Sequence, residues 1–131
     1  MELTIEQALQ QGIAAHREGK VQEAERLYRS IIQSQPTHPD ANHNLGVLAA
    51  SVNKLESAYP LFKTALQANP NMEQYWVSYI KAHIKEQHYE GARQILQQGI
   101  VSGLKGDKID RLEAELRRVV VLNSPQVEDT S

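Results

Sequence analysis

Five histidines are the most reactive side chains of this sequence, and their spacing does not fit a metal site. His83 and His88 are five residues apart, and so are His38 and His43. Zinc-binding histidines that share a helix are usually four residues apart, as in the H-E-x-x-H motif. We therefore interpret these histidines as surface or groove residues. The sequence predicts no metal and no cofactor.

The remaining candidates for chemistry are two aromatic and two basic residues. Trp76 and Tyr79 have the spacing of a stacking pair for bases, but packing in a core is the favoured interpretation. Lys81 and Lys85 are one helical turn apart, where they either hold an acidic partner or form a solvated helix face. The sequence has no phosphate-binding glycine motif, no G-x-S-x-G and no H-E-x-x-H. It therefore predicts no catalytic residue and no enzyme.

Composition excludes further classes of protein. The 131 residues include 16 acidic and 14 basic side chains, and a net charge of −2 gives no general affinity for nucleic acid or an anionic membrane. The absence of cysteine excludes disulfides and thiolate zinc sites. No apolar run approaches the roughly 20 residues of a membrane span, and residues 1–6 lack the features of a secretory signal. We therefore expect a cytoplasmic protein.

The sequence repeats itself at a period of 34 residues. Small residues, large apolar residues and prolines all recur at this step. The positions that keep it are Ala24, Ala58 and Ala92; Tyr28, Phe62 and Leu96; Gly12 and Gly46; and Pro36 and Pro70. In repeat three, Ile80 and Leu104 stand where the glycine and the proline would fall.

This pattern resembles the tetratricopeptide repeat (TPR) family over roughly residues 4–122. The resemblance implies an all-α fold, a right-handed α-solenoid of three helix-turn-helix units with a C-terminal capping helix. The repeats would span about 5–38, 39–72 and 73–106. Within a repeat, Gly12 would pack against Ala24, and Gly46 against Ala58, where the two helices cross closely.

Capping signals and apolar periodicity predict where each helix begins and ends. We expect helix pairs at about 5–17 and 21–34, 39–52 and 55–68, and 73–86 and 89–102, then a capping helix over 107–122. Thr4 with Gln7 is a capping box, His38 or Thr37 precedes the helix that begins at Pro39, and Asn53 is a cap for the next helix. The TPR domain would cover 1–122, and 123–131 would be a flexible acidic tail.

In TPR domains the first helix of each repeat lines a concave groove, and the resemblance places ten residues of this sequence there. Five of them are apolar at positions that packing within a repeat need not bury. The predicted partner-binding residues are Leu9, Ile13, Arg17, His43, Asn44, Val47, Val77, Lys81, Ile84 and Lys85. An apolar stripe on such a face predicts an occupant. That occupant is a helix or extended segment of a partner, or this chain's own terminal helix folded back.

Two known recognition patterns of TPR domains can be compared with this groove. Of the five positions that form the carboxylate clamp of heat-shock co-chaperones, only Asn44 carries the expected residue, so the clamp is absent. Asn44 also resembles one rung of the asparagine ladder in the TPR arm of O-linked N-acetylglucosamine transferases. Gln10 and Ser78 interrupt that ladder.

The sequence therefore predicts a non-enzymatic module that binds a protein or peptide, without nucleic acid or membrane partners. Two alternatives stay open. One is a structural unit that self-associates weakly through the solenoid ends and the Val119–Leu122 cluster. The other is an N-terminal recruitment arm of a larger glycosyltransferase or sulfotransferase, because the stretch from His38 to Leu66 resembles the TPR arms of bacterial proteins of that kind.

Overall fold

The computed structural model describes residues 2–123, and over this range the chain forms seven α-helices and no strand. They are α1 (Ile5–Arg17), α2 (Val21–Ser34), α3 (Pro39–Ser51), α4 (Leu55–Ala68), α5 (Glu73–Lys85), α6 (Tyr89–Val101) and α7 (Asp107–Asn123). Each helix begins at the predicted residue and ends within one residue of the predicted end. Apart from Asn123, the predicted acidic tail lies outside the described residues.

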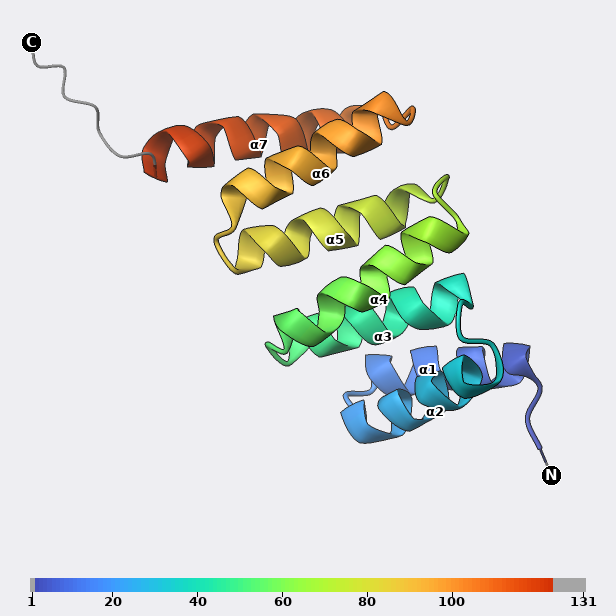
Figure 1. Ribbon diagram of the computed structural model, residues 1–131. Coiled ribbons are helices and arrows are strands. Elements are labelled where there is room, and N and C mark those ends of the chain that lie inside the picture. The colour runs from blue at the N-terminus through green and yellow to red at the C-terminus, as the bar shows by residue number, and fades with distance from the viewer. Residues whose placement is uncertain (1, 124–131) are drawn as a thin grey trace, which may run out of the picture.

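The helices stack in chain order, with the N-terminus at one end and α7 at the other (Figure 1). α1 packs on α2, α3 on α4 and α5 on α6, and each pair rests on the next one through α2 with α3, α4 with α5 and α6 with α7. The first helices also contact each other, α1 with α3 and α3 with α5. This is an α-solenoid of three helix pairs with a capping helix, which confirms the predicted fold.

Two of the predicted helix caps are present as expected. The backbone N–H of Gln7 donates to Thr4 Oγ1 at 3.0 Å, and the backbone N–H of Thr4 donates to Gln7 Oε1 at 2.9 Å. This reciprocal pair is a capping box at the start of α1. At the start of α3, the backbone N–H of Ala41 donates to His38 Nδ1 at 3.1 Å. His38 is therefore the N-cap of α3, and its Nδ1 is occupied by this hydrogen bond.

The first helix of every repeat ends in the same backbone turn. Gly19, Asn53 and Gln87, which are 34 residues apart, have positive φ angles of 77°, 63° and 62°. In each turn the next backbone N–H donates to the carbonyl five residues back at 2.8 Å, which is the Schellman motif. The prediction that Asn53 caps α4 is wrong, because its left-handed conformation closes α3 and Lys54 is the N-cap.

An aromatic ring fills the space beside the glycine of repeats one and two. A Cβ added to Gly12 would lie 2.6 Å from Tyr28 Cε1, and one added to Gly46 would lie 2.7 Å from Phe62 Cε1. Both rings are almost completely buried. The glycines therefore make room for the rings of Tyr28 and Phe62, which the sequence prediction, built on Ala24 and Ala58, does not include.

Repeat three fills the same space in a different way. Ile80 replaces the glycine and Leu96 replaces the aromatic ring, and both are buried. The side-chain volume moves from the second helix to the first, a swap that a core tolerates. A Cβ added to Gly99, further along α6, would be 2.7 Å from Leu104 Cδ2 and 3.2 Å from Trp76 Cε3. Gly99 therefore makes room for the indole ring and for the residue that replaces the usual proline.

The last helix covers the apolar end of the stack. Ile109, Leu112 and Leu116 of α7 are buried in the core that runs from α4 to α7. The charged residues of α7 lie on its exposed side. An apolar inner face with a polar back is what the terminal helix of a solenoid requires.

Gly46→Ala should lower the free energy of unfolding by about 1–3 kcal/mol, because the new methyl group would enter the space of the Phe62 ring. Alanine in a helix interior otherwise stabilises by roughly 0.5–1 kcal/mol over glycine, so a loss reports the contact. Urea unfolding followed by circular dichroism measures it. The same change should cost less in a Phe62→Leu background, and an equal cost in both backgrounds would contradict this account.

Gln87→Gly should raise the free energy of unfolding by about 0.5–1 kcal/mol. Gln87 is exposed at a φ of 62°, a conformation that costs a residue with a Cβ about 1–2 kcal/mol. Glycine removes this cost, but its greater freedom in the unfolded chain offsets part of the stabilisation. The matched control is Gln97→Gly on the exposed side of α6, which should destabilise. Thermal unfolding compares the two, and a fall in both would show that the turn is unstrained.

Candidate functional site

Two neighbouring depressions lie across the first helices of the three repeats. The first has a volume of about 280 Å³ and is lined by Ile13, His16, Arg17, Tyr28, Asn44 and Val47. The second has a volume of about 260 Å³ and is lined by Val47, Ala50, Ser51, Phe62, Ser78, Lys81, Ala82 and Lys85. Val47 lines both, so the depressions lie side by side over α1, α3 and α5. We call the two depressions together the first-helix groove.

Six of the ten predicted partner-binding residues line this groove. They are Ile13, Arg17, Asn44, Val47, Lys81 and Lys85. The other seven residues that line it are not among the ten: His16, Tyr28, Ala50, Ser51, Phe62, Ser78 and Ala82. Tyr28, Phe62 and Ala82 are buried, and their positions in the repeat indicate packing, so nothing in the sequence marks them as groove residues.

The other four predicted residues are placed differently. Leu9, His43 and Val77 are 6%, 7% and 1% exposed, and the two apolar side chains belong to the core. The expectation that Leu9, His43 and Val77 are open groove residues is therefore wrong, because packing beyond the single repeat buries all three. Ile84 is half-buried against the core and lines neither depression.

Three side-chain hydrogen bonds join α3 to α5, each between residues 35 positions apart. The hydroxyl of Tyr75 donates to Asp40, His43 Nε2 lies 2.8 Å from Ser78 Oγ, and Lys85 Nζ donates to the backbone carbonyl of Ala50 at 2.8 Å. Between α1 and α3 no such bond is present among residues 2–123. The second depression, between α3 and α5, is therefore held by polar contacts that the first one lacks.

His43 is the centre of this polar contact. An amide oxygen can only accept, so His43 Nδ1–H donates to Asn44 Oδ1 at 3.0 Å, and Nε2 accepts from the Ser78 hydroxyl. The ring stacks on Tyr75 with 4.7 Å between centroids. Burial lowers the pKa of His43 below its ordinary value of 6.5, against smaller opposing effects of the Asn44 hydrogen bond and the charge of Asp40. His43 is therefore neutral at pH 7.

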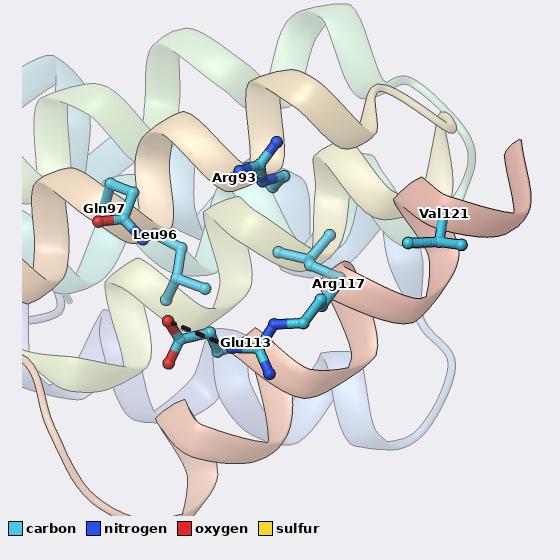
Figure 2. Close-up of a pocket in the computed structure, with 7 residues that line it drawn as sticks. Arg93, Leu96, Gln97, Glu113, Arg117 and Val121 are labelled. Carbon is cyan, nitrogen blue, oxygen red and sulfur yellow. Dashed lines mark ion pairs between the residues drawn. The ribbon is translucent and has the colours of Figure 1, made fainter. Parts of the chain in front are cut away.

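Of the clefts outside the groove, two have buried residues in their lining. One, of about 340 Å³, separates α6 from α7, and Figure 2 shows Arg93, Leu96 and Gln97 of α6 and Glu113, Arg117 and Val121 of α7 around it. The other, of about 640 Å³, runs over α4, α5 and α6, with Trp76, Tyr79 and His83 as part of its lining.

The aromatic residues of the larger cleft belong to the core. Trp76 and Tyr79 are each 8% exposed, and Trp76 Nε1 donates to the backbone carbonyl of Pro70 at 2.9 Å. The interpretation of Trp76 as a packing residue is therefore confirmed. His83 stacks on Tyr59 with 4.3 Å between centroids.

Within residues 2–123 no three His, Asp or Glu side chains gather as possible metal ligands. None of the described helices is long and apolar enough to cross a membrane.

A family model described as tetratricopeptide repeat matches residues 49–116, slightly more than half of the sequence. The chain therefore belongs to the tetratricopeptide repeat family, which confirms the resemblance found in the sequence. No curated protein sequence matches it. The fold is typical of scaffolds for protein–protein interaction, and proteins of this family are generally non-catalytic.

Several solved structures share the fold at low sequence identity. The Sgt2 TPR domain from Aspergillus fumigatus superposes with a TM-score of 0.79 at 18% identity, over 97% of this chain and 90% of that one. A tetratricopeptide repeat protein from Parabacteroides merdae gives 0.78 at 21% identity, over 90% of this chain and 46% of that one. PilF of Pseudomonas aeruginosa superposes with a TM-score of 0.72 at 20% identity, over 90% of this chain and 54% of that one. These similarities show the fold alone.

Acidification should destabilise the protein through His43. Because its pKa is lowered in the folded state, the unfolded chain binds more protons below pH 6.5. Stability from this residue is therefore complete above pH 6.5 and falls below it, by at most about 1.4 kcal/mol per pH unit. Urea unfolding at several pH values between 8 and 5 gives the free energy of unfolding as a function of pH. This free energy should fall less steeply with decreasing pH for His43→Asn than for wild type. Parallel slopes would show that His43 does not titrate differently on folding.

Proposed function

We propose that the first-helix groove binds a segment of another protein and that the chain is a non-enzymatic interaction module. The observation that carries this proposal is the adjacency of the two depressions. Val47 is a half-buried apolar residue that lines both of them, and the half-buried Ile13 adds a second apolar side chain to the first. Each depression is smaller than the roughly 300–1,000 Å³ of a drug-sized ligand pocket. Their size favours the successive side chains of a peptide.

Asn44 supplies a hydrogen bond for the backbone of such a segment. Its Oδ1 already accepts from His43, so the amide group is held in one orientation. The Asn44 side chain lines the first depression, and its NH₂ donates to no other residue among those described. An amide N–H beside an apolar path is suited to a peptide carbonyl, which every segment offers irrespective of its sequence. This is the role of the single asparagine rung predicted from the resemblance.

The terminal helix does not fill the groove. α7 packs on α6, and none of its residues is among those that line the two depressions. Figure 1 shows α7 at the end of the stack, beyond α6. The alternative in which the chain's own terminal helix folds back into the groove is therefore not the arrangement of residues 2–123. This leaves the apolar path of α1, α3 and α5 open to a partner.

The two other roles suggested by the sequence stay predictions. Self-association through the solenoid ends would use Val121 and Leu122, which are exposed near the end of α7. Light scattering over a range of concentrations measures it. A recruitment arm would be followed by a transferase domain in the full-length gene product. Neither role conflicts with an open groove.

The proposal is tested by selecting displayed peptides on the immobilised protein and measuring their affinity for variants. Val47→Asp should weaken binding by about tenfold or more, because it places a carboxylate where an apolar contact worth about 1–3 kcal/mol is made. Asn44→Ala should weaken the same peptides. The matched control is Val101→Asp, at a position of α6 that is 86% exposed and lies outside the groove.

Thermal unfolding separates loss of binding from loss of structure. Val47→Asp and Val101→Asp should melt within a few degrees of wild type. A loss of about 1 kcal/mol lowers the melting temperature by roughly 4–8 °C in a domain of about 60–100 residues and by roughly 2–4 °C in one of about 150–250 residues, and this chain lies between them. The proposal fails if selected peptides bind Val47→Asp as well as they bind wild type. It also fails if Val47→Asp unfolds the protein, because Val47 is then a core residue.

A further inference from the structure

The first-helix groove carries cations on its rim, and none of the residues that line it is acidic. Arg17 lines the first depression, and Lys81 and Lys85 line the second. All three side chains are exposed. Arg17 and Lys85 occupy the same position of repeats one and three, near the ends of α1 and α5. The groove is therefore apolar along its floor and positive along one rim, in a chain whose net charge is −2.

The carboxylates closest in sequence to these cations are engaged elsewhere. Glu18, which follows Arg17, forms an ion pair with Lys20 at 3.0 Å. Glu86, which follows Lys85, accepts a hydrogen bond from the Tyr59 hydroxyl at 2.6 Å and lies 3.4 Å from His88 Nδ1.

Inside the stack, Asp40 accepts from the Tyr75 hydroxyl. Among residues 2–123 no carboxylate pairs with Arg17, Lys81 or Lys85. The positive rim is therefore not neutralised by any carboxylate of residues 2–123.

Lys85 is held in place over the second depression. Its Nζ donates to the backbone carbonyl of Ala50 at 2.8 Å, which ties the end of α5 to α3. An ammonium group has three donors, so two remain for a partner. Lys81 lies one turn before Lys85 on the same side of α5, and both line the same depression. Together they place two ammonium groups beside an apolar floor made by Val47, Phe62 and Ala82.

We propose that the partner segment bound by the first-helix groove is an acidic peptide, with apolar side chains in the two depressions and carboxylates against Arg17, Lys81 and Lys85. This proposal rests on the proposed function and names the chemistry of its partner. Complementary charge gives specificity and a faster encounter, while the apolar contacts supply most of the affinity.

A nucleic acid fits this surface less well, because three cations and an apolar floor offer few phosphate contacts. Of the rings in the lining, Tyr28 and Phe62 are buried and His16 is half-buried, which leaves little surface for base stacking.

The test uses peptides selected from a random library on the full chain, made synthetically with a fluorescent label. Each peptide is compared with a version in which every Asp and Glu is replaced by Asn and Gln. We expect acidic residues beside apolar ones in the selected sequences. The neutralised versions should bind about tenfold more weakly, and raising the salt concentration should weaken only the acidic versions.

Charge-reversal variants locate the contact. Lys81→Glu with Lys85→Glu should weaken the acidic peptides by about tenfold or more, because attraction is replaced by repulsion. The matched control is Lys105→Glu with Lys108→Glu, which makes the same change in net charge at exposed positions outside the groove. The control should leave the affinity nearly unchanged.

The outcomes separate this inference from the proposed function. Two results would overturn the inference but keep the proposed function: selected peptides that are neutral or basic, or equal affinity for the two double variants, in each case with Val47→Asp still abolishing binding. The groove would then bind peptides without selecting acidic ones. If binding survives Val47→Asp, the proposed function itself is wrong. Displacement of a bound peptide by a single-stranded oligonucleotide would show a general polyanion surface and would also overturn the inference.

Discussion

The structure depends on how closely the two helices of a repeat can approach, and a ring set beside a glycine determines this in repeats one and two. Tyr28 and Phe62 occupy the space that a Cβ at Gly12 or Gly46 would take. The same two residues, each 1% exposed, are among those that line the groove, one in each depression. The contact that joins a helix pair therefore also forms part of the floor on which a partner would rest, so stability and recognition share these residues.

A second constraint acts between repeats, and it differs along the stack. α1 meets α3 through apolar contacts, whereas α3 meets α5 through a hydrogen-bonded set that includes the buried, neutral His43. A buried polar contact is favourable only when its geometry is satisfied, so it specifies one arrangement more strictly than apolar packing does. We infer that the second depression has the better defined shape and that the first one adapts more easily.

The sequence predicted what short-range packing determines and missed what longer-range contacts determine. The 34-residue period, the helix limits and the Thr4 capping box follow from residues within one helix pair, and all are present. Asn53 was assigned to the wrong helix end, since asparagine suits both an N-cap and a left-handed turn. Val77 was expected to be open, but its burial depends on the distance between neighbouring repeats, which no residue pattern states.

The order of the stack has a consequence for how parts of the molecule open. Each helix of a solenoid is supported mainly by its neighbours in the chain, so local unfolding can begin at an end without disturbing the middle. α7 packs chiefly on α6, and no residue of α6 or α7 lines the first-helix groove. Backbone amides of α7 can therefore exchange with solvent while the surface that a partner would meet keeps its shape.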